Sequence, residues 1–237
     1  MPARRLALAL AALAACSSGI DGIPISALRP DFTVETPFLG PTRVTAVLWQ
    51  GDARFQLYEW DRLSGSAGGE ARVLLPVEGP GGPGYAGDFP PLLEGDLASV
   101  SYATLGSPGA VPSTVRSPTP VAMTSPSAGT TVAAGGTLPV AWLPSGTGDG
   151  VRVRIRVTRC SGGGTGGEAV EAVPDTGSAD VTVPPEILPP VIPPGGSCTA
   201  AVLVERFRAG EVNGQFAPGG RIEARQASNV VAVAVAP

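Results

Sequence analysis

Short runs in which apolar and polar residues alternate restrict the fold of this chain more than any other feature. The run VRVRIRV at 151–157 puts aliphatic side chains on one face and Arg152, Arg154 and Arg156 on the other. The same two-residue period recurs in three further runs, at 138–142, 200–204 and 231–235. A period of two is typical of half-buried β-strands, whereas an amphipathic helix repeats every ~3.6 residues. The chain is therefore predicted to be all-β.

The composition excludes several classes of active site. None of the 237 residues is histidine, so no Ser-His-Asp triad, Cys-His pair or histidine zinc site can be built. The 16 basic residues, all arginine, are outnumbered by 20 acidic ones, which argues against a nucleic-acid partner. The 33 glycines and 26 prolines disfavour long helices, yet 43% hydrophobic residues are enough for a core. We predict no cofactor and no metal site.

The N-terminus carries a targeting pattern. Two arginines at 4–5 precede the uncharged apolar run 6–12. That run is too short to span a membrane but suits the hydrophobic region of a secretory signal peptide. The sequence Leu13-Ala14-Ala15-Cys16 follows directly and resembles the lipobox of bacterial lipoproteins.

This resemblance implies a processing route and a location. The signal peptide 1–15 would be removed, and the thiol of Cys16 would carry a diacylglyceryl group that anchors the chain in a membrane. Serines at 17–18, with no aspartate directly after the cysteine, imply the outer membrane of a bacterial cell envelope. An ordinary cleaved signal with an incidental cysteine is the alternative.

A stretch rich in proline and glycine divides the mature chain. Residues 106–120 (GSPGAVPSTVRSPTP) resist both helix and β-ladder, which predicts a linker between domains. The linker separates a small β domain at 31–105 from a larger β domain at 121–237. Residues 16–30 are small and polar and are predicted to be a flexible tether.

The small β domain is predicted to begin with a hairpin. Strands at 42–50 and 53–60 would be joined by the two-residue turn Gly51-Asp52. Further strands are expected at 72–78 and 96–105, and the segment 79–91 is too rich in glycine and proline to be regular. The domain is small for a complete sandwich, so we expect it to pack against its neighbour for stability.

The larger domain resembles a fibronectin type III domain over roughly residues 119–237. The segment 125–142 (SPSAGTTVAAGGTLPVAW) matches the opening of that family, with Trp142 as its core tryptophan on the second strand. The segment 194–207 (PPGGSCTAAVLVERF) is similar to its sixth strand, although Cys198 replaces the corner tyrosine of the family. The resemblance implies an immunoglobulin-like sandwich of about seven strands.

The same resemblance brings two cysteines together. Cys160 would end the third strand and Cys198 would begin the sixth, and these strands are antiparallel neighbours in the family. Because the envelope is oxidising, we predict a disulfide, which would enclose 37 residues and stabilise the fold by about 3–4 kcal/mol. Strict alternation puts the two cysteines on opposite faces, so a bulge or a strand end must correct the geometry.

Two sets of side chains are candidates for a ligand surface. Tyr58 and Trp60 are aromatic residues among the acids Asp52, Glu59 and Asp61, a combination found in sugar-binding and sugar-hydrolysing proteins. Ordinary surface acids are the alternative.

The arginine row is the second candidate. Arg152, Arg154 and Arg156 could bind an anionic sugar or a phosphate, but such a row is more often a solvated face paired with neighbouring acids such as Glu205.

The function predicted from the sequence is a non-catalytic binding or structural role in a lipid-anchored envelope protein. Its partners would be the membrane, through the lipid on Cys16, and an unidentified envelope protein or glycan. The competing class is an enzyme that acts on cell-wall or extracellular polysaccharide through carboxylates.

Overall fold

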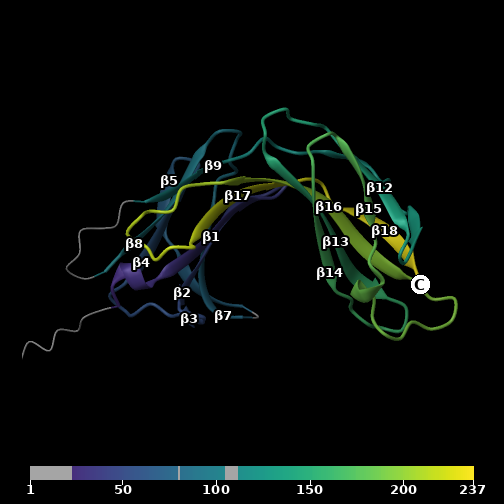
Figure 1. Cartoon of the computed structure of the whole chain (residues 1–237), viewed down its shortest axis with the longest axis horizontal. Coiled ribbons are helices and arrows are strands. Elements are labelled where there is room, and N and C mark those ends of the chain that lie inside the picture. The colour runs from purple at the N-terminus through teal and green to yellow at the C-terminus, as the bar shows by residue number, and fades with distance from the viewer. Residues whose placement is uncertain (1–22, 80, 105–111) are drawn as a thin grey trace, which may run out of the picture.

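The computed structural model describes residues 23–79, 81–104 and 112–237. Apart from two short 3-10 helices, η1 (Ile25–Ala27) and η2 (Pro185–Ile187), the regular structure of these residues is β-strand, so the all-β prediction is confirmed. The strands build two lobes that together form an arch (Figure 1). In the described ranges, no helix is both long and apolar enough to cross a membrane.

The first lobe is a complete immunoglobulin-type sandwich. One sheet has the order β1–β2–β7–β6, with the short β3 also on β2, and the other has the order β5–β4–β8–β9. This is the ABED and CFG arrangement of constant-type domains, with β5 as an extra strand beside C. The nine strands are β1 (Arg29–Thr36), β2 (Thr42–Gln50), β3 (Ala53–Phe55), β4 (Arg62–Ala67), β5 (Glu70–Val73), β6 (Leu75–Gly79), β7 (Gly82–Phe89), β8 (Leu97–Ala103) and β9 (Ser113–Arg116).

The second lobe is the predicted fibronectin-like sandwich. Strands β10, β12 and β15 form one sheet, and β14, β13, β16 and β18 lie side by side in the other, with β11 parallel to β18. The alternation of 151–157 is confirmed, because its four aliphatic side chains are all buried in the core that holds Trp142. The strands are β10 (Met123–Ser125), β11 (Thr131–Ala133), β12 (Thr137–Trp142), β13 (Gly150–Cys160), β14 (Glu168–Val173), β15 (Ser178–Thr182), β16 (Cys198–Ala209) and β18 (Val231–Ala236).

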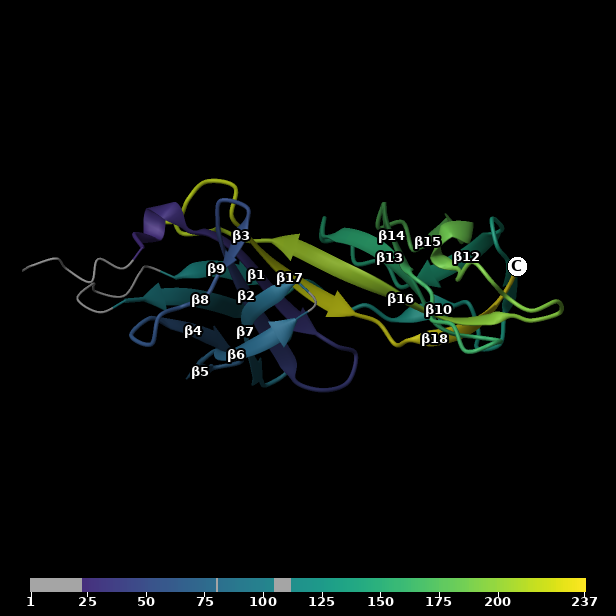
Figure 2. The same cartoon turned by 90° about the horizontal axis from the view of Figure 1, so that it is seen from below.

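One sheet continues through both lobes. The first half of the 12-residue strand β16 pairs with β18, and its second half pairs with β17 (Arg221–Ala227). Strand β17 then pairs in parallel with β1 of the first lobe. The β16–β17 hairpin of the second lobe thus extends the sheet of the first, and Figure 2 shows these strands crossing between the lobes.

The stretch predicted as a linker is partly structured. Ser113–Arg116 forms strand β9 on the edge of β8, with Ser113 and Val115 buried. The flanking Pro112 and Pro118 lie outside the strand, so they do not interrupt its ladder. The second half of the stretch therefore belongs to the first lobe.

Two predicted strands are shorter or interrupted in the structure. The turn Gly51-Asp52 is confirmed, but the strand after it ends at Phe55 instead of residue 60. The predicted strand 72–78 is divided into β5 and β6, which belong to different sheets. The buried Leu74 crosses between the sheets at this point and donates its N–H to the carbonyl of Leu63.

The expectation of an irregular segment at 79–91 is wrong, because Gly82–Phe89 forms the paired strand β7. Gly87 of this strand and Gly65 of the facing sheet allow close packing. A Cβ on Gly87 would lie 3.0 Å from Leu74 Cδ2, and one on Gly65 of β4 would lie 2.9 Å from Phe89 Cζ. Large side chains from the facing sheets thus occupy the space over these glycines.

Candidate functional site

An aromatic cluster lies on the segment 56–61 between β3 and β4. The rings of Tyr58 and Trp60 stack with centroids 5.4 Å apart and an interplanar angle of 17°. The edge-to-face contact of Phe55 with Tyr58 has a centroid distance of 5.8 Å and holds the stack against the buried end of β3. Tyr58 keeps 43% of its surface exposed, so an aromatic ring remains accessible to a ligand.

Asp61 shapes this segment and is 7% exposed. Its Oδ2 accepts the N–H of Tyr58 at 3.3 Å, and its own N–H donates to the Tyr58 carbonyl at 3.0 Å. These two bonds close a tight turn and end the strand that the sequence predicts up to residue 60. The other oxygen, Oδ1, is buried without a hydrogen bond of normal geometry from a described residue.

Two tyrosines surround the Asp61 carboxylate. The Tyr85 hydroxyl accepts the N–H of Leu57 at 2.7 Å, so its own proton is free for another acceptor. Burial raises the pKa of Tyr85, and the negative charge of Asp61 raises it further. Burial is also the main reason that the pKa of Tyr102 is raised, followed by repulsion from and hydrogen bonding to Asp61. Both hydroxyls therefore stay protonated well above neutral pH.

The segment 56–61 borders a pocket of about 300 Å³. Of the predicted site residues, Tyr58, Glu59 and Asp61 line it, whereas Trp60 stacks on Tyr58 and Asp52 is exposed on the β2–β3 turn. The sequence does not predict the other side of the pocket, which consists of Val73, Leu74, Leu75 and Pro76 at the β5–β6 crossing and Tyr85 of β7.

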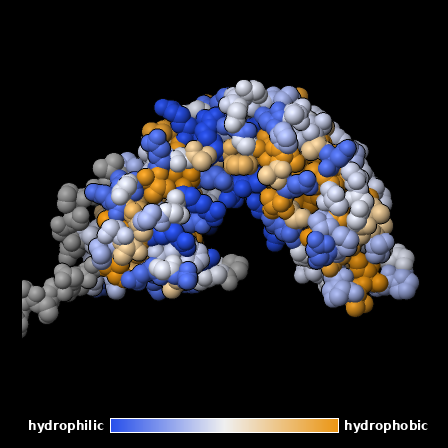
Figure 3. Space-filling model, viewed as in Figure 1, coloured by the Kyte–Doolittle hydropathy of each residue, from blue (hydrophilic) through white to orange (hydrophobic). Residues whose placement is uncertain are grey.

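The arginine row lies on the solvent face of the shared sheet, which forms the inner side of the arch. Figure 3 shows hydrophilic residues along this inner side. Arg152 and Arg154 both bind Glu205, with N–O distances of 2.7 and 3.1 Å. Arg152 also pairs with Glu223 of β17, and its guanidinium lies 4.6 Å from the ring centroid of Phe207.

The row is therefore largely neutralised by carboxylates. Arg154 has a second partner in Glu168 at 2.9 Å, whereas Arg156 is exposed. The pairing with Glu205 that the sequence suggests is present and joins β13 to β16, and the Arg152–Glu223 pair adds a link from β13 to β17.

The disulfide between Cys160 and Cys198 is present, with a Cα–Cα distance of 3.9 Å. The register of β13 against β16 shifts between Val157 and Arg159, which turns Cys160 to the same face as Cys198. This bulge is the correction that strict alternation requires. Cys16, the predicted lipidation site, lies outside the described residues.

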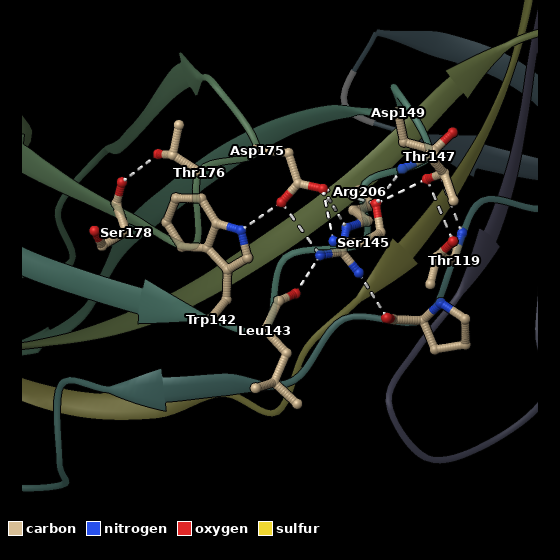
Figure 4. A network of polar contacts seen from close by, with 11 residues as sticks. Thr119, Trp142, Leu143, Ser145, Thr147, Asp149, Asp175, Thr176, Ser178 and Arg206 are labelled. Atoms are coloured by element: carbon tan, nitrogen blue, oxygen red, sulfur yellow. Dashed lines mark hydrogen bonds and ion pairs between the residues drawn. The ribbon is translucent and has the colours of Figure 1, made fainter.

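A buried ion pair that sequence reasoning missed connects the segments near the lobe junction (Figure 4). Arg206 of β16 is 1% exposed and binds Asp175 Oδ1 at 3.2 Å. It also donates to the carbonyl of Pro120 at 2.8 Å and to the carbonyl of Leu143. The sequence carried a signal, because Val202, Val204 and Arg206 share one face and the arginine therefore points inward.

The carboxylate of Asp175 accepts hydrogen bonds from three segments of the chain. Its Oδ1 accepts the indole N–H of Trp142 at 2.8 Å, and its Oδ2 accepts the Ser145 hydroxyl at 2.7 Å. Burial alone would raise the pKa of Asp175, but the hydrogen bonds from Trp142, Ser145 and Arg206 outweigh burial and lower the pKa to about 2. Asp175 is thus an ionised structural group.

Further contacts fix the end of the predicted linker. Arg208 donates to Asp149 Oδ1 at 2.7 Å, and Asp149 Oδ2 accepts the N–H of Thr119 at 3.2 Å. Gln226 of β17 donates to Ser117 Oγ at 2.8 Å and to the Leu92 carbonyl at 3.0 Å. These bonds join both lobes to residues 117–119.

Comparisons with known proteins add little. No protein-family model matches the chain, and no curated protein sequence matches it. Among solved structures, it is similar to the FN1–FN3 domains of chicken CNTN1 (15% identity, 91% of this chain, 68% of that chain, TM-score 0.26). It is also similar to a two-domain fibronectin type III segment of chicken tenascin (13%, 88% and 99%, TM-score 0.24). A third similar structure is the Yersinia pseudotuberculosis adhesin InvE (13%, 84% and 58%, TM-score 0.23).

Proposed function

We propose that the protein is a lipid-anchored bacterial envelope protein with a non-catalytic binding role. The observation that carries the binding role is the Tyr58–Trp60 stack, in which Tyr58 is exposed and Trp60 half-buried, beside a pocket with a buried carboxylate. Concave sites with aromatic walls and a few fixed polar groups are typical of ligand-binding proteins. The shared sheet supports this role, because it holds the pocket on a stiff scaffold.

The anchor is tested by processing of the full-length chain in a bacterium that makes lipoproteins. We expect the mature protein to begin at Cys16, to carry fatty acyl chains by intact-mass analysis and to sediment with membranes. The control is Cys16→Ala, which should lack acylation. A mature wild-type protein without acyl chains would contradict the anchor and the location in the outer membrane.

The binding role is tested by site-specific photo-crosslinking in intact cells. A photoreactive side chain at Tyr58 should capture an envelope component, whereas one at the equally exposed Val170 on β14 serves as the matched control. Capture from both positions, or from neither, would contradict a binding site at Tyr58.

Polysaccharide hydrolysis is the second candidate, because Glu59 and Asp61 line the same pocket. Glycosidases use two carboxyl groups about 5–9 Å apart across the scissile bond. The assay measures new reducing ends in a polysaccharide. Their appearance with the wild-type protein, and their absence with each of the single variants Glu59→Gln and Asp61→Asn, would establish an enzyme. Unchanged oligosaccharide would leave the binding role in place.

A further inference from the structure

The described chain begins at the end of the first lobe that points away from the second lobe, drawn in purple in Figure 1. Ile23 is half-buried and packs against the core of the first lobe. A few residues later, the carbonyl of Leu28 accepts the N–H of Ala217 at 2.9 Å. The chain is therefore attached to this end of the lobe from Ile23 onward. Only six residues, 17–22, lie between Ile23 and the predicted lipidation site Cys16.

This short connection keeps the same end of the lobe close to the lipid. An extended chain spans at most ~3.6 Å per residue, so Ile23 lies no more than about 25 Å from Cys16. The 12-residue strand β16, which connects the two lobes, is already about 40 Å long. Acylation of Cys16 therefore brings the end of the first lobe next to the bilayer, and the second lobe lies farther along the arch.

The stacked rings of Tyr58 and Trp60 lie at this end of the lobe as well. Strands β2 and β8 both start near the lobe junction, because the N–H of Leu92, shortly before β8, donates to Thr42 Oγ1 at the start of β2. At their other ends, β2 lies beside the start of β1, and β8 lies beside the start of β4. The segment 56–61 leads directly into β4, so its rings and the start of the described chain share one end. This end, the tip of the first lobe, consists of residues 23–29 and 50–62.

We propose that the tip of the first lobe lies against the membrane, with the rings of Tyr58 and Trp60 in the headgroup region of a phospholipid bilayer. The inference rests on the proposed acylation of Cys16. Tyrosine and tryptophan are enriched at membrane–water interfaces, because each has an apolar ring and one polar group that stays hydrated. Tyr58 is exposed and Trp60 is half-buried, so both rings have surface that can contact lipid. The envelope component that meets Tyr58 is then the phospholipid itself.

The tip carries no net charge, although the chain as a whole is acidic. Its charged residues are three arginines and three acids: Arg29, Asp52, Arg54, Glu59, Asp61 and Arg62. An anionic lipid surface therefore does not repel the tip, whereas it repels the net negative charge of the rest of the chain. The exposed Arg62 adds a charged donor for a lipid phosphate.

Quenching of tryptophan fluorescence by brominated lipid tests the position of Trp60. The mature acylated protein is reconstituted in phosphatidylcholine vesicles whose acyl chains are either brominated or unmodified. Trp60 is one of three tryptophans, so its contact with lipid should remove up to about a third of the emission. Trp60→Phe keeps a ring in the stack and should abolish most of this quenching. Trp49→Phe is the matched control and should retain the quenching, because Trp49 lies between the guanidinium groups of Arg29 and Arg54.

Folding of each variant is checked by its thermal transition. If Trp60→Phe does not fold, a photoreactive side chain at Tyr58 in the same vesicles decides: it should attach to phospholipid, whereas one at Val170 on β14 should not. Acylated protein that is bound to vesicles but shows no quenching, or equal quenching in Trp60→Phe, would overturn this inference and leave the anchor intact. A mature protein without acyl chains would overturn the anchor and the inference together. Capture of a protein or glycan at Tyr58 in cells, with no lipid captured in vesicles, would overturn the inference and leave the binding role in place.

Discussion

Replacing Asp175 by asparagine should destabilise the protein strongly. The substitution removes the anionic partner of Arg206, whose side chain is 1% exposed, and leaves a buried cation with neutral acceptors only. Breaking a buried ion pair on one side costs about 3–5 kcal/mol. We expect a loss of this size in the free energy of unfolding, measured by urea denaturation at neutral pH.

The pH dependence separates the charge from the shape of Asp175. Its pKa is about 2 in the folded protein against an ordinary value of 3.8, so ionised Asp175 contributes about 2 kcal/mol to stability. Since the folded-state pKa is the lower one, this contribution is complete above about pH 4 and is lost as the pH falls through 2. The asparagine variant lacks this dependence. Its stability should therefore approach that of the wild type as the solution is acidified.

Asp180→Asn is the matched control, because Asp180 is an exposed acid on β15. It should change the stability by less than about 0.5 kcal/mol. A cost of less than about 1 kcal/mol for Asp175→Asn at neutral pH would contradict a stabilising Asp175–Arg206 ion pair. A difference between wild type and variant that stays constant down to pH 2 would also refute it.

Three further substitutions test the packing. Cys198→Ala removes the disulfide to Cys160 and should lower the free energy of unfolding by about 3–4 kcal/mol. Reduction of the wild-type protein should lower it by a similar amount. An unchanged urea midpoint after reduction would contradict this prediction. Phe216 lies in the β16–β17 hairpin, but its ring is buried in the core of the first lobe. Phe216→Ala should therefore lower the free energy of unfolding by about 3–5 kcal/mol and speed hydrogen exchange in the first lobe. Faster exchange confined to the second lobe would contradict this packing. Gly65→Ala places a Cβ 2.9 Å from Phe89 Cζ and should cost about 1–3 kcal/mol, measured by urea denaturation, whereas a neutral effect would mean that the ring moves freely.

The faces of the strands could be predicted from the sequence because alternation encodes them directly. Leu138, Val140 and Trp142 are all buried, as their two-residue spacing predicts. Tyr102 of β8 follows the same rule. These predictions need only the local geometry of a strand, which places successive side chains on opposite faces.

The pairing of the cysteines depends on one feature that alternation alone does not provide. Cys160 follows the arginine face by parity, and only the register shift after Val157 brings it opposite Cys198. A sequence can show that a bulge is required, as it did here, but the position of the bulge depends on the partner strand.

Only one side of the candidate pocket could be predicted from the sequence. Tyr58, Glu59 and Asp61 are close in sequence, so their association is local. Leu75 and Tyr85 reach the same pocket because the chain crosses from one sheet to the other at Leu74. Such a crossing depends on long-range packing, which leaves no short-range pattern in the sequence.

The parallel pairing of β17 with β1 is the least predictable feature and the one that makes the two lobes a unit. The two strands lie about 190 residues apart in the chain, as the Asp31–Arg221 ion pair illustrates. Because β17 is hydrogen-bonded to β16 on one side and to β1 on the other, rotation of the lobes would break one of the two ladders. Gln226 and Arg208 add hydrogen bonds to the carbonyls of Leu92 and Ser117 that would break in the same movement. The pocket of the first lobe is therefore held in a fixed orientation to the second lobe, and a ligand bound there would meet a preorganised surface.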